Sequence, residues 1–227
     1  MATRRKRSPA TRLPLSRDRV LRTAIELADQ DGIDALSMRR LGSELGVEAM
    51  SLYNHVASKD DLLDGIADLL IEEIEVPAAG DWRSAMRRRA ISAHEMLARH
   101  PWANGVIESR TTPSPTRSRY PEAVLGTLRR AGFSIEMAVH AFFALDSYIY
   151  GFAVQQQNLP SGTPEELAGM AETTLATLPA AEYPHLREVI VDYVLKSGFD
   201  YTKEFEFGLD MLLDALEHAR DGAATGE

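Results

Sequence analysis

Apolar residues recur every three or four positions along most of the chain, which is the spacing that lines one face of an α-helix. No stretch alternates apolar and polar residues as a half-buried strand does. The pattern therefore predicts an all-α protein. The expected helices cover residues 16–31, 37–45, 48–55, 58–74, 82–99, 102–109, 117–131 and 134–157, one that begins near 164, and finally 182–196 and 200–220.

Capping and breaking residues divide these helices into two groups. Ser16 can cap the first helix, and the segment from Ser58 to Asp61 has the spacing of a capping box. The sequence Pro-Ala-Ala-Gly at 77–80 then interrupts the helical pattern. We therefore expect a flexible arm at 1–15, a small helical domain at 16–62 and a larger one at 63–227, with the helix at 58–75 bridging the two.

Charge is distributed unevenly along the 227 residues, whose formal net charge is −9. Residues 1–59 hold 11 Lys or Arg against 7 Asp or Glu, whereas the remainder holds 14 against 27. A basic N-terminal region on an otherwise acidic chain indicates local contact with a polyanion. A basic run such as 4–7 can equally be a solvated tail.

The composition excludes several classes of protein. With no cysteine, the chain has no disulfide scaffold, no thiolate zinc site and no cysteine nucleophile. The longest apolar run, residues 138–154, is interrupted by His140 and Asp146 and is shorter than the roughly 20 residues of a membrane span. No apolar leader follows the first residues. We expect a cytoplasmic protein without membrane contact.

One stretch, residues 37–59 (SMRRLGSELGVEAMSLYNHVASK), places two short helices on either side of a tight turn. Its leucines and a valine are spaced to form a small core between the helices. Gly42 leaves room for a close crossing, and Gly46 supplies the permissive backbone that the turn needs. This is the pattern of a helix-turn-helix, whose second helix lies in the major groove of DNA.

The amino-acid sequence of this stretch resembles the TetR family of bacterial regulators, and LGVEAMSLYNHVASKDDLLD is similar to its tetracycline repressor subgroup. The segment GFSIE at 132–136, followed by a long apolar helix, resembles the larger domain of that subgroup. The resemblance is close over 16–64 and follows helix order over 82–157 and 200–220. It implies a transcriptional repressor that binds double-stranded DNA as a homodimer on a palindromic operator and is released by a small apolar or aromatic effector.

The same resemblance assigns the DNA contacts. Arg39 matches a base-contacting arginine, and Lys59 matches a phosphate-binding lysine. Ala49 and Met50 fall where base edges are read, and only apolar contacts, for example with a thymine methyl group, are open to them. Taken singly, each position also has a structural reading, such as core packing for Tyr53. The predicted DNA-binding set is Arg39, Ala49, Met50, Ser51, Tyr53, Asn54, His55 and Lys59.

The larger domain is, by resemblance, a ligand-binding and dimerisation domain. Its helix at 134–157 is apolar nearly all round, and its last helix carries two apolar stripes, so both are expected to be buried on more than one side. The predicted dimer interface is the stripe Phe205, Leu209, Leu212, Leu213 and Leu216, and Phe207 and Met211 form the other stripe. The predicted ligand pocket is Met86, Ala90, Ala93, His94, Leu97, Trp102, Val106, Phe142, Phe143 and Met170, although plain core packing is the commoner role for each of these residue types.

Tetracycline itself does not fit the sequence. The subgroup holds the magnesium of the drug with a histidine after its sixth helix, and residues 105–110 contain no histidine. Arg89 stands where the subgroup has a drug-contacting asparagine, and Glu75 lies near the place of a second histidine. The resemblance therefore implies the architecture and the switch but not the drug. No metal site and no cofactor are predicted.

Two other functions remain open at this point. One is a DNA-binding structural or interaction protein with no small-molecule switch. The other is an enzyme in the larger domain, for which no catalytic residues can be named, because the chain has no Gly-rich phosphate loop, no HExxH motif and no nucleophile elbow.

Overall fold

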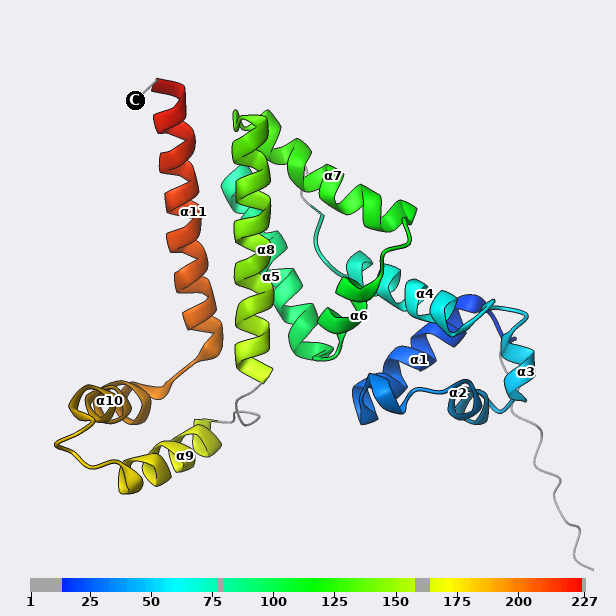
Figure 1. Ribbon diagram of the computed structural model, residues 1–227, viewed down its shortest axis with the longest axis horizontal. Helices are drawn as coiled ribbons and strands as arrows, with labels where there is room; N and C mark the ends of the chain where they lie inside the picture. Colours follow the sequence, from blue (N-terminus) through cyan, green and yellow to red (C-terminus); the bar gives the residue numbers. More distant parts are fainter. Residues whose placement is uncertain (1–13, 77–79, 158–163, 226–227) are drawn as a thin grey trace, which may run out of the picture. The chain divides into compact units, whose positions relative to one another are not determined.

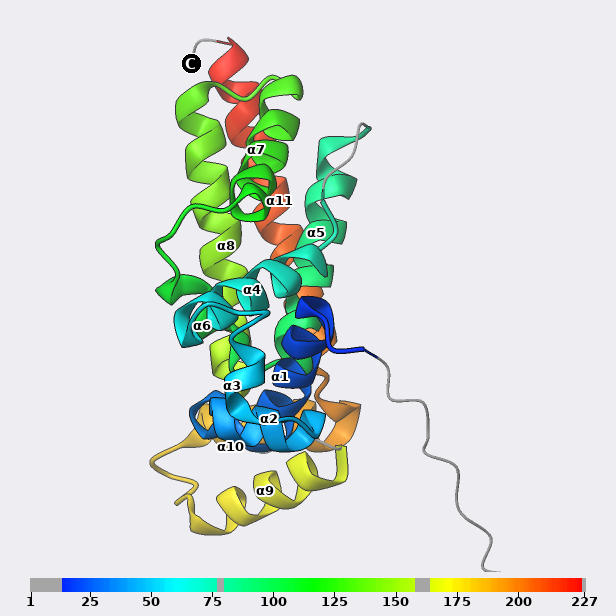
Figure 2. The same ribbon diagram turned by 90° about the vertical axis from the view of Figure 1, so that its right-hand side faces the viewer.

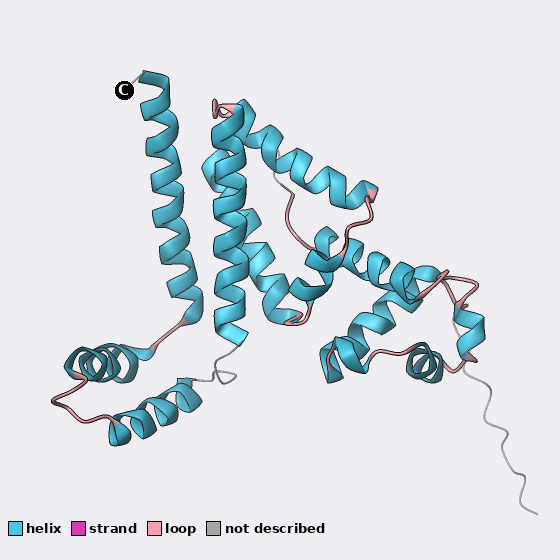
Figure 3. Ribbon diagram, in the orientation of Figure 1, coloured by secondary structure: helices cyan, strands magenta, loops and turns pink. Residues whose placement is uncertain are grey.

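The computed structural model describes residues 14–76, 80–157 and 164–225. Within these ranges every regular element is a helix and none is a strand (Figures 1 and 3), which confirms the all-α prediction. The chain forms two compact units. Unit 1 is the chain up to Leu69 together with Gly105–Thr112, and unit 2 is Leu70–Asn104 with Pro113–Glu227. The division falls between Leu69 and Leu70, within the helix expected to bridge the two domains, a few residues after the predicted position at residue 62. Most of the expected basic arm, residues 1–13, lies outside the described ranges.

Unit 1 is a small helical domain held by capped helices. Ser16 Oγ accepts a hydrogen bond from Arg19 N (3.2 Å), and Ser37 Oγ accepts one from Arg40 N (3.3 Å), so each serine starts a helix as expected. Arg110 Nη1 lies 3.3 Å from Asp60 Oδ1, which joins residues 105–112 to this unit. The elements are α1 (Arg17–Asp31), the 3₁₀ turn η1 (Ile33–Ala35), α2 (Met38–Leu45), α3 (Ala49–Leu52) and the first part of α4 (Lys59–Glu72).

Unit 2 is built on three long helices. In it α5, α8 and α11 pack against one another and α7 packs on α8, while α9 packs on the π-helix (Figures 1 and 2). The elements are α5 (Trp82–Arg99), α6 (Ala103–Ser109, which crosses into unit 1), α7 (Pro115–Arg130), α8 (Ile135–Gln157), α9 (Pro164–Thr177), α10 (Pro184–Val189), the π-helix η2 (Ile190–Gly198) and α11 (Tyr201–Thr225).

Two helices near the C-terminus differ from the sequence prediction. The single helix expected at 182–196 is a short α-helix followed by a π-helix that continues to Gly198. The last helix continues to Thr225 instead of ending near 220, because its final residues include alanines, which favour helix. Thr163, the residue that the sequence offers as a cap for the helix expected to begin near 164, lies outside the described residues.

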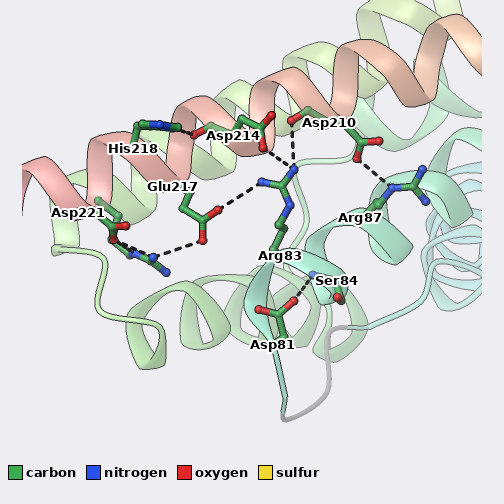
Figure 4. Close-up of polar contacts among 10 residues, drawn as sticks. Asp81, Arg83, Ser84, Arg87, Asp210, Asp214, Glu217, His218 and Asp221 are labelled. Atoms are coloured by element: carbon green, nitrogen blue, oxygen red, sulfur yellow. Dashed lines mark hydrogen bonds and ion pairs between the residues drawn. The ribbon is translucent and has the colours of Figure 1, made fainter.

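Arginines on α5 fix the position of α11 along it (Figure 4). Arg83 Nη2 lies 2.6 Å from Asp214 Oδ1, and Arg87 contacts Glu206 Oε2 (2.6 Å) and Asp210 Oδ1 (3.0 Å). These side chains are partly exposed, so each pair adds little stability on its own. Their spacing along both helices nevertheless selects one register for the packing of α11 on α5.

Helix α8 is longer than the apolar run that the sequence displays. Its 23 residues include a window with a mean hydropathy of 1.3, so by length and composition alone it could cross a membrane. Core helices meet the same criterion. The side chains of Ala138, Leu145 and Ile149 are buried within unit 2, and Asp146 forms an ion pair with an arginine of α5. Helix α8 is therefore a core helix of unit 2.

Candidate functional site

The helix-turn-helix of unit 1 depends on two glycines. Gly46 ends α2 with φ 68° and ψ 36°, a left-handed conformation that favours glycine. A Cβ atom at Gly42 would lie 2.9 Å from Val47 O and 3.1 Å from Ala49 N. Gly42 is therefore required by the close crossing of α2 and α3, and Gly46 by the turn between them, as the sequence predicts. Leu41 and Leu52 are fully buried between the helices.

Around this small core, the predicted DNA-contacting side chains face solvent to different degrees. Met50 is 76 % exposed and Tyr53 is 44 % exposed, so Tyr53 is not a core aromatic. Helix α3 is a single turn rather than the expected 48–55, and Tyr53, Asn54 and His55 follow it in a turn. Arg39, Asn54 and Lys59 are exposed, and Ala49, Ser51 and His55 are half-buried.

An arginine of α1 ties this segment to the start of α4. Arg17 Nη1 donates to the carbonyl oxygen of His55 (3.0 Å) and to Asp61 Oδ2 (2.8 Å), and Nη2 donates to Asp61 Oδ1 (2.6 Å). Asp61 Oδ2 also accepts from Ala57 N (2.7 Å), while Ser58 Oγ accepts from Asp61 N (3.0 Å). Hydrogen bonding from Arg17 and from Ala57 N holds the pKa of Asp61 below its usual range. The sequence analysis did not identify Arg17 as part of this site.

The Arg17–Asp61 link gives a testable stability effect. Asp61→Asn removes the charge that Arg17 pairs with, and we expect a loss of about 1 kcal/mol at pH 7, since the pair is partly exposed. Because the pKa of Asp61 is lowered in the folded protein, its contribution is present above the unfolded pKa of about 3.9 and is lost as the pH falls through the folded pKa. Urea unfolding should therefore show a constant difference from pH 7 to about pH 5, shrinking below about pH 4.

The matched control is Asp18→Asn, which breaks an exposed pair with Arg22 four residues along α1. We expect it to cost only a few tenths of a kcal/mol (about 0.3). Equal losses for the two variants would show that the Arg17–Asp61 pair does not hold the residues after α3 in place.

The core of unit 2 contains a buried cation. Arg89 of α5 is 0 % exposed, and its Nε donates to Tyr120 Oη of α7 (2.7 Å), while Nη2 pairs with Asp146 of α8. The rings of Tyr120 and Phe142 flank the guanidinium, with centroids 5.1 and 5.6 Å from Cζ. Burial raises the pKa of Asp146, and the charge of Arg89 opposes that shift. Three helices thus converge on Arg89.

His94 of α5 is a satisfied core histidine. Its ring stacks on Phe205 with centroids 4.2 Å apart, and Nε2 donates to Gln156 Oε1 at 2.8 Å. Burial lowers the pKa of His94, with the hydrogen bond to Gln156 acting in the opposite direction. The neutral ring is therefore favoured, with one face packed on Phe205 and Nε2 hydrogen-bonded to Gln156.

The other predicted pocket residues differ in how exposed they are and in where they lie. Phe143 is 64 % exposed and is therefore not a pocket wall within this chain. Met170 is also exposed and lines a separate groove of about 220 Å³ formed by α9, η2 and the start of α11. Trp102 is half-buried beside His100, and Val106 is buried within unit 1. The members buried in unit 2 are Met86, Ala90, Ala93, His94 and Leu97, and Phe142 is half-buried.

Comparisons with known proteins decide the family. Residues 76–220 match the family described as "Tetracyclin repressor-like, C-terminal domain", and residues 20–66 match "Bacterial regulatory proteins, tetR family". The chain belongs to the tetracycline repressor-like family. It is 34% identical to the HTH-type transcriptional repressor DrrR1 of Streptomyces coeruleorubidus, over 95% of this chain and 82% of that protein.

Further relatives agree with this placement. The tetracycline repressor protein class C of Escherichia coli is 30% identical over 91% of this chain and 92% of its own length. The crystal structure of the Streptomyces coelicolor TetR family protein ActR in complex with actinorhodin has a TM-score of 0.72 at 30% identity, covering 95% of this chain and 100% of that chain. This member of the tetracycline repressor-like family is a DNA-binding transcriptional regulator, as the stretch at 37–59 predicts.

The structure corrects the predicted dimer stripe of this tetracycline repressor-like regulator. Phe205, Leu209, Leu213 and Leu216 are buried within their own chain, and Leu212 is half-buried. They contribute to the core because they lie on the side of α11 that packs against α5 and α8. The opposite stripe is exposed, with Phe207 at 67 % and Met211 at 59 %. Ile135, Val139 and Phe143, spaced four residues apart, form an exposed apolar stripe on α8.

Proposed function

We propose that this regulator is a homodimeric repressor that binds a palindromic operator and leaves it when a small aromatic effector binds unit 2. The observation that carries the DNA-binding half is the exposure of Met50, Tyr53 and Arg39 on a segment locked by Gly42 and Arg17. A segment that reads bases in a DNA groove needs both exposed side chains and a fixed backbone, because base contacts require side chains that are held in place.

Each predicted contact has a separate role in this proposal. Arg39 is a base-reading arginine, with the fork of donors that fits guanine. Met50 offers an apolar contact to a thymine methyl group, while Ser51, Tyr53 and Lys59 fix the register on phosphates. The basic arm adds backbone or minor-groove contacts. DNA recognition thus depends on one arginine and on apolar contacts rather than on a row of polar side chains.

Dimerisation is supported by the exposed apolar stripes of α8 and α11. Phe143, Phe207 and Met211 are large side chains that lose favourable burial if they stay in water. A two-fold dimer formed by these stripes presents two copies of α2 and α3, so its operator is a palindrome with half-sites about 34–36 Å apart.

Release by an effector is supported by relatives and by the continuity of α4. ActR was crystallised with actinorhodin, and several relatives are tetracycline repressors. Helix α4 runs without a break across the boundary between the two units. We propose that an effector that prefers the released state changes the spacing of the half-sites through α4.

The regulator is proposed to work without a catalytic role and without a metal of its own. Among the residues that the structure describes, no group of three or more His, Cys, Asp or Glu side chains could hold a metal ion. Residues 105–110 contain no histidine for the magnesium of a chelated drug. We therefore propose that this cytoplasmic, DNA-bound regulator responds to a different effector.

Two substitutions separate base reading from phosphate binding. Lys59→Ala should weaken binding to every DNA sequence and reduce the salt slope of log Kobs by about one unit. Arg39→Ala should cost about 1–3 kcal/mol on the operator and much less on random DNA. Fluorescence anisotropy with operator and scrambled duplexes at several salt concentrations measures both effects. An Arg39→Ala loss that is equal on both duplexes would reassign Arg39 to the phosphates.

A further inference from the structure

The guanidinium of Arg89 has a donor that the protein leaves unused. A guanidinium carries five N–H groups. Tyr120 accepts from Nε and Asp146 from Nη2. Nη1 is buried and has no hydrogen-bond partner among the described residues. An unpaired buried donor on a charged group is costly, and native proteins keep such groups where something else completes them.

The surroundings of Arg89 indicate what kind of group completes it. The only carboxylate paired with Arg89 among the described residues is Asp146. Burial raises the pKa of Asp146, so this counter-charge is formed against a desolvation penalty. The ion pair with Asp146 balances the charge of Arg89 but leaves Nη1 without an acceptor among the described residues. A carboxylate offers two acceptor oxygens in the plane of the guanidinium and a negative charge, so it fits the donors that Nη1 leaves unused.

We propose that the effector of this regulator is an aromatic carboxylic acid, whose carboxylate accepts hydrogen bonds from Nη1 of Arg89. This rests on the proposed function, since it names the chemical class of the effector. The aromatic part follows from Phe142 and Tyr120, whose rings already flank the guanidinium within 6 Å and favour an aromatic neighbour. Arg89 thus acts as the charge-selective residue of unit 2.

The test uses paired probes that differ only in charge. Benzoate, 2-naphthoate and anthracene-2-carboxylate are each titrated calorimetrically into the full chain, beside the corresponding primary amide. We expect at least one acid to bind about 10-fold or more tightly than its amide, as a charge-assisted pair predicts. If no acid binds more tightly than its amide, the inference is overturned.

Three variants locate the charge preference. Arg89→Met should abolish it, whereas Arg88→Met, which removes an exposed arginine paired with Glu75 on the same helix, should leave it unchanged. Asp146→Asn keeps Arg89 and removes its competing anion, so the preferred acid should bind about 10-fold more tightly. If Arg89→Met fails to fold, Asp146→Asn still tests the inference. Unchanged or weaker binding to Asp146→Asn would place the carboxylate elsewhere and overturn the inference.

The outcome is separable from that of the proposed function because these titrations contain no DNA. An operator complex that a neutral compound releases would overturn the carboxylate inference and keep the repressor. An operator complex that no ligand releases, with the acid preference and its Arg89 dependence intact, would keep the carboxylate site and contradict the switch.

Discussion

Replacing both Phe207 and Met211 with aspartate is expected to leave the protein monomeric. Both side chains are exposed on α11, and burying such a side chain in an interface contributes about 1.5–3 kcal/mol. Two residues from each of two protomers then contribute about 6–12 kcal/mol, and buried unpaired carboxylates would oppose association further. The affinity of the two protomers for each other should fall by at least about 1,000-fold. Sedimentation equilibrium measures this change directly.

Loss of the dimer should also lower operator affinity, because a monomer contacts only one half-site. The control is Thr202→Asp, which adds one negative charge at an exposed position near the start of the same helix, away from the Phe207 stripe. It should dimerise like the wild type. If the double variant remains dimeric, the interface lies elsewhere and the exposed stripes of α8 and α11 need another explanation.

Changing Gly42 to alanine should abolish specific operator binding. The added Cβ would meet Val47 O at 2.9 Å and Ala49 N at 3.1 Å, both of which are backbone atoms that cannot rotate away. Overpacking of this kind costs about 1–3 kcal/mol of stability. It also displaces α3 relative to α2, and losing two contacts of about 1–3 kcal/mol each lowers operator affinity by about 30-fold or more.

The control for this prediction is Gly105→Ala on α6, also within unit 1. A Cβ at Gly105 meets nothing within 4 Å. This substitution should stabilise the protein by up to about 1 kcal/mol, because alanine favours helix over glycine. Operator affinity should stay unchanged. Circular dichroism with urea and duplex anisotropy measure both quantities, and wild-type operator affinity in the Gly42 variant would contradict the close-crossing account.

The helix-turn-helix could be predicted almost completely because its determinants are local. Ser37 caps α2, Gly46 ends it, and Gly42 sits where α3 crosses, all within ten residues. Local sequence therefore specified the turn, the crossing and the exposed side chains. Only the length of α3 was overestimated, since the residues after Leu52 form a turn instead of a second helical turn.

Contacts between distant residues could not be read in this way. Arg17 and Asp61 are 44 positions apart, and each looks like an ordinary surface charge in its own helix. Arg89 gave a weak signal, because it falls on the apolar stripe of α5 with Met86 and Ala93. That signal became informative only when Tyr120 and Asp146 were found beside it.

The two faces of α11 show a different limit. Both of its stripes are apolar, and a helix pattern does not say which stripe meets its own chain and which meets a partner. Burial shows that the Phe205 stripe belongs to the core and that the Phe207 stripe is exposed. The number of apolar residues in a stripe was therefore a poor guide to the partner-facing side.

The most direct test of the repressor account is selection of bound duplexes from a random-sequence DNA library on the purified full-length protein, followed by sequencing. The account predicts a single enriched palindrome whose half-sites repeat with about one or more helical turns between their centres. The enrichment should disappear with Arg39→Ala. Recovery of unrelated sequences, held only by salt-sensitive nonspecific binding, would contradict the claim that this protein reads an operator through α2 and α3.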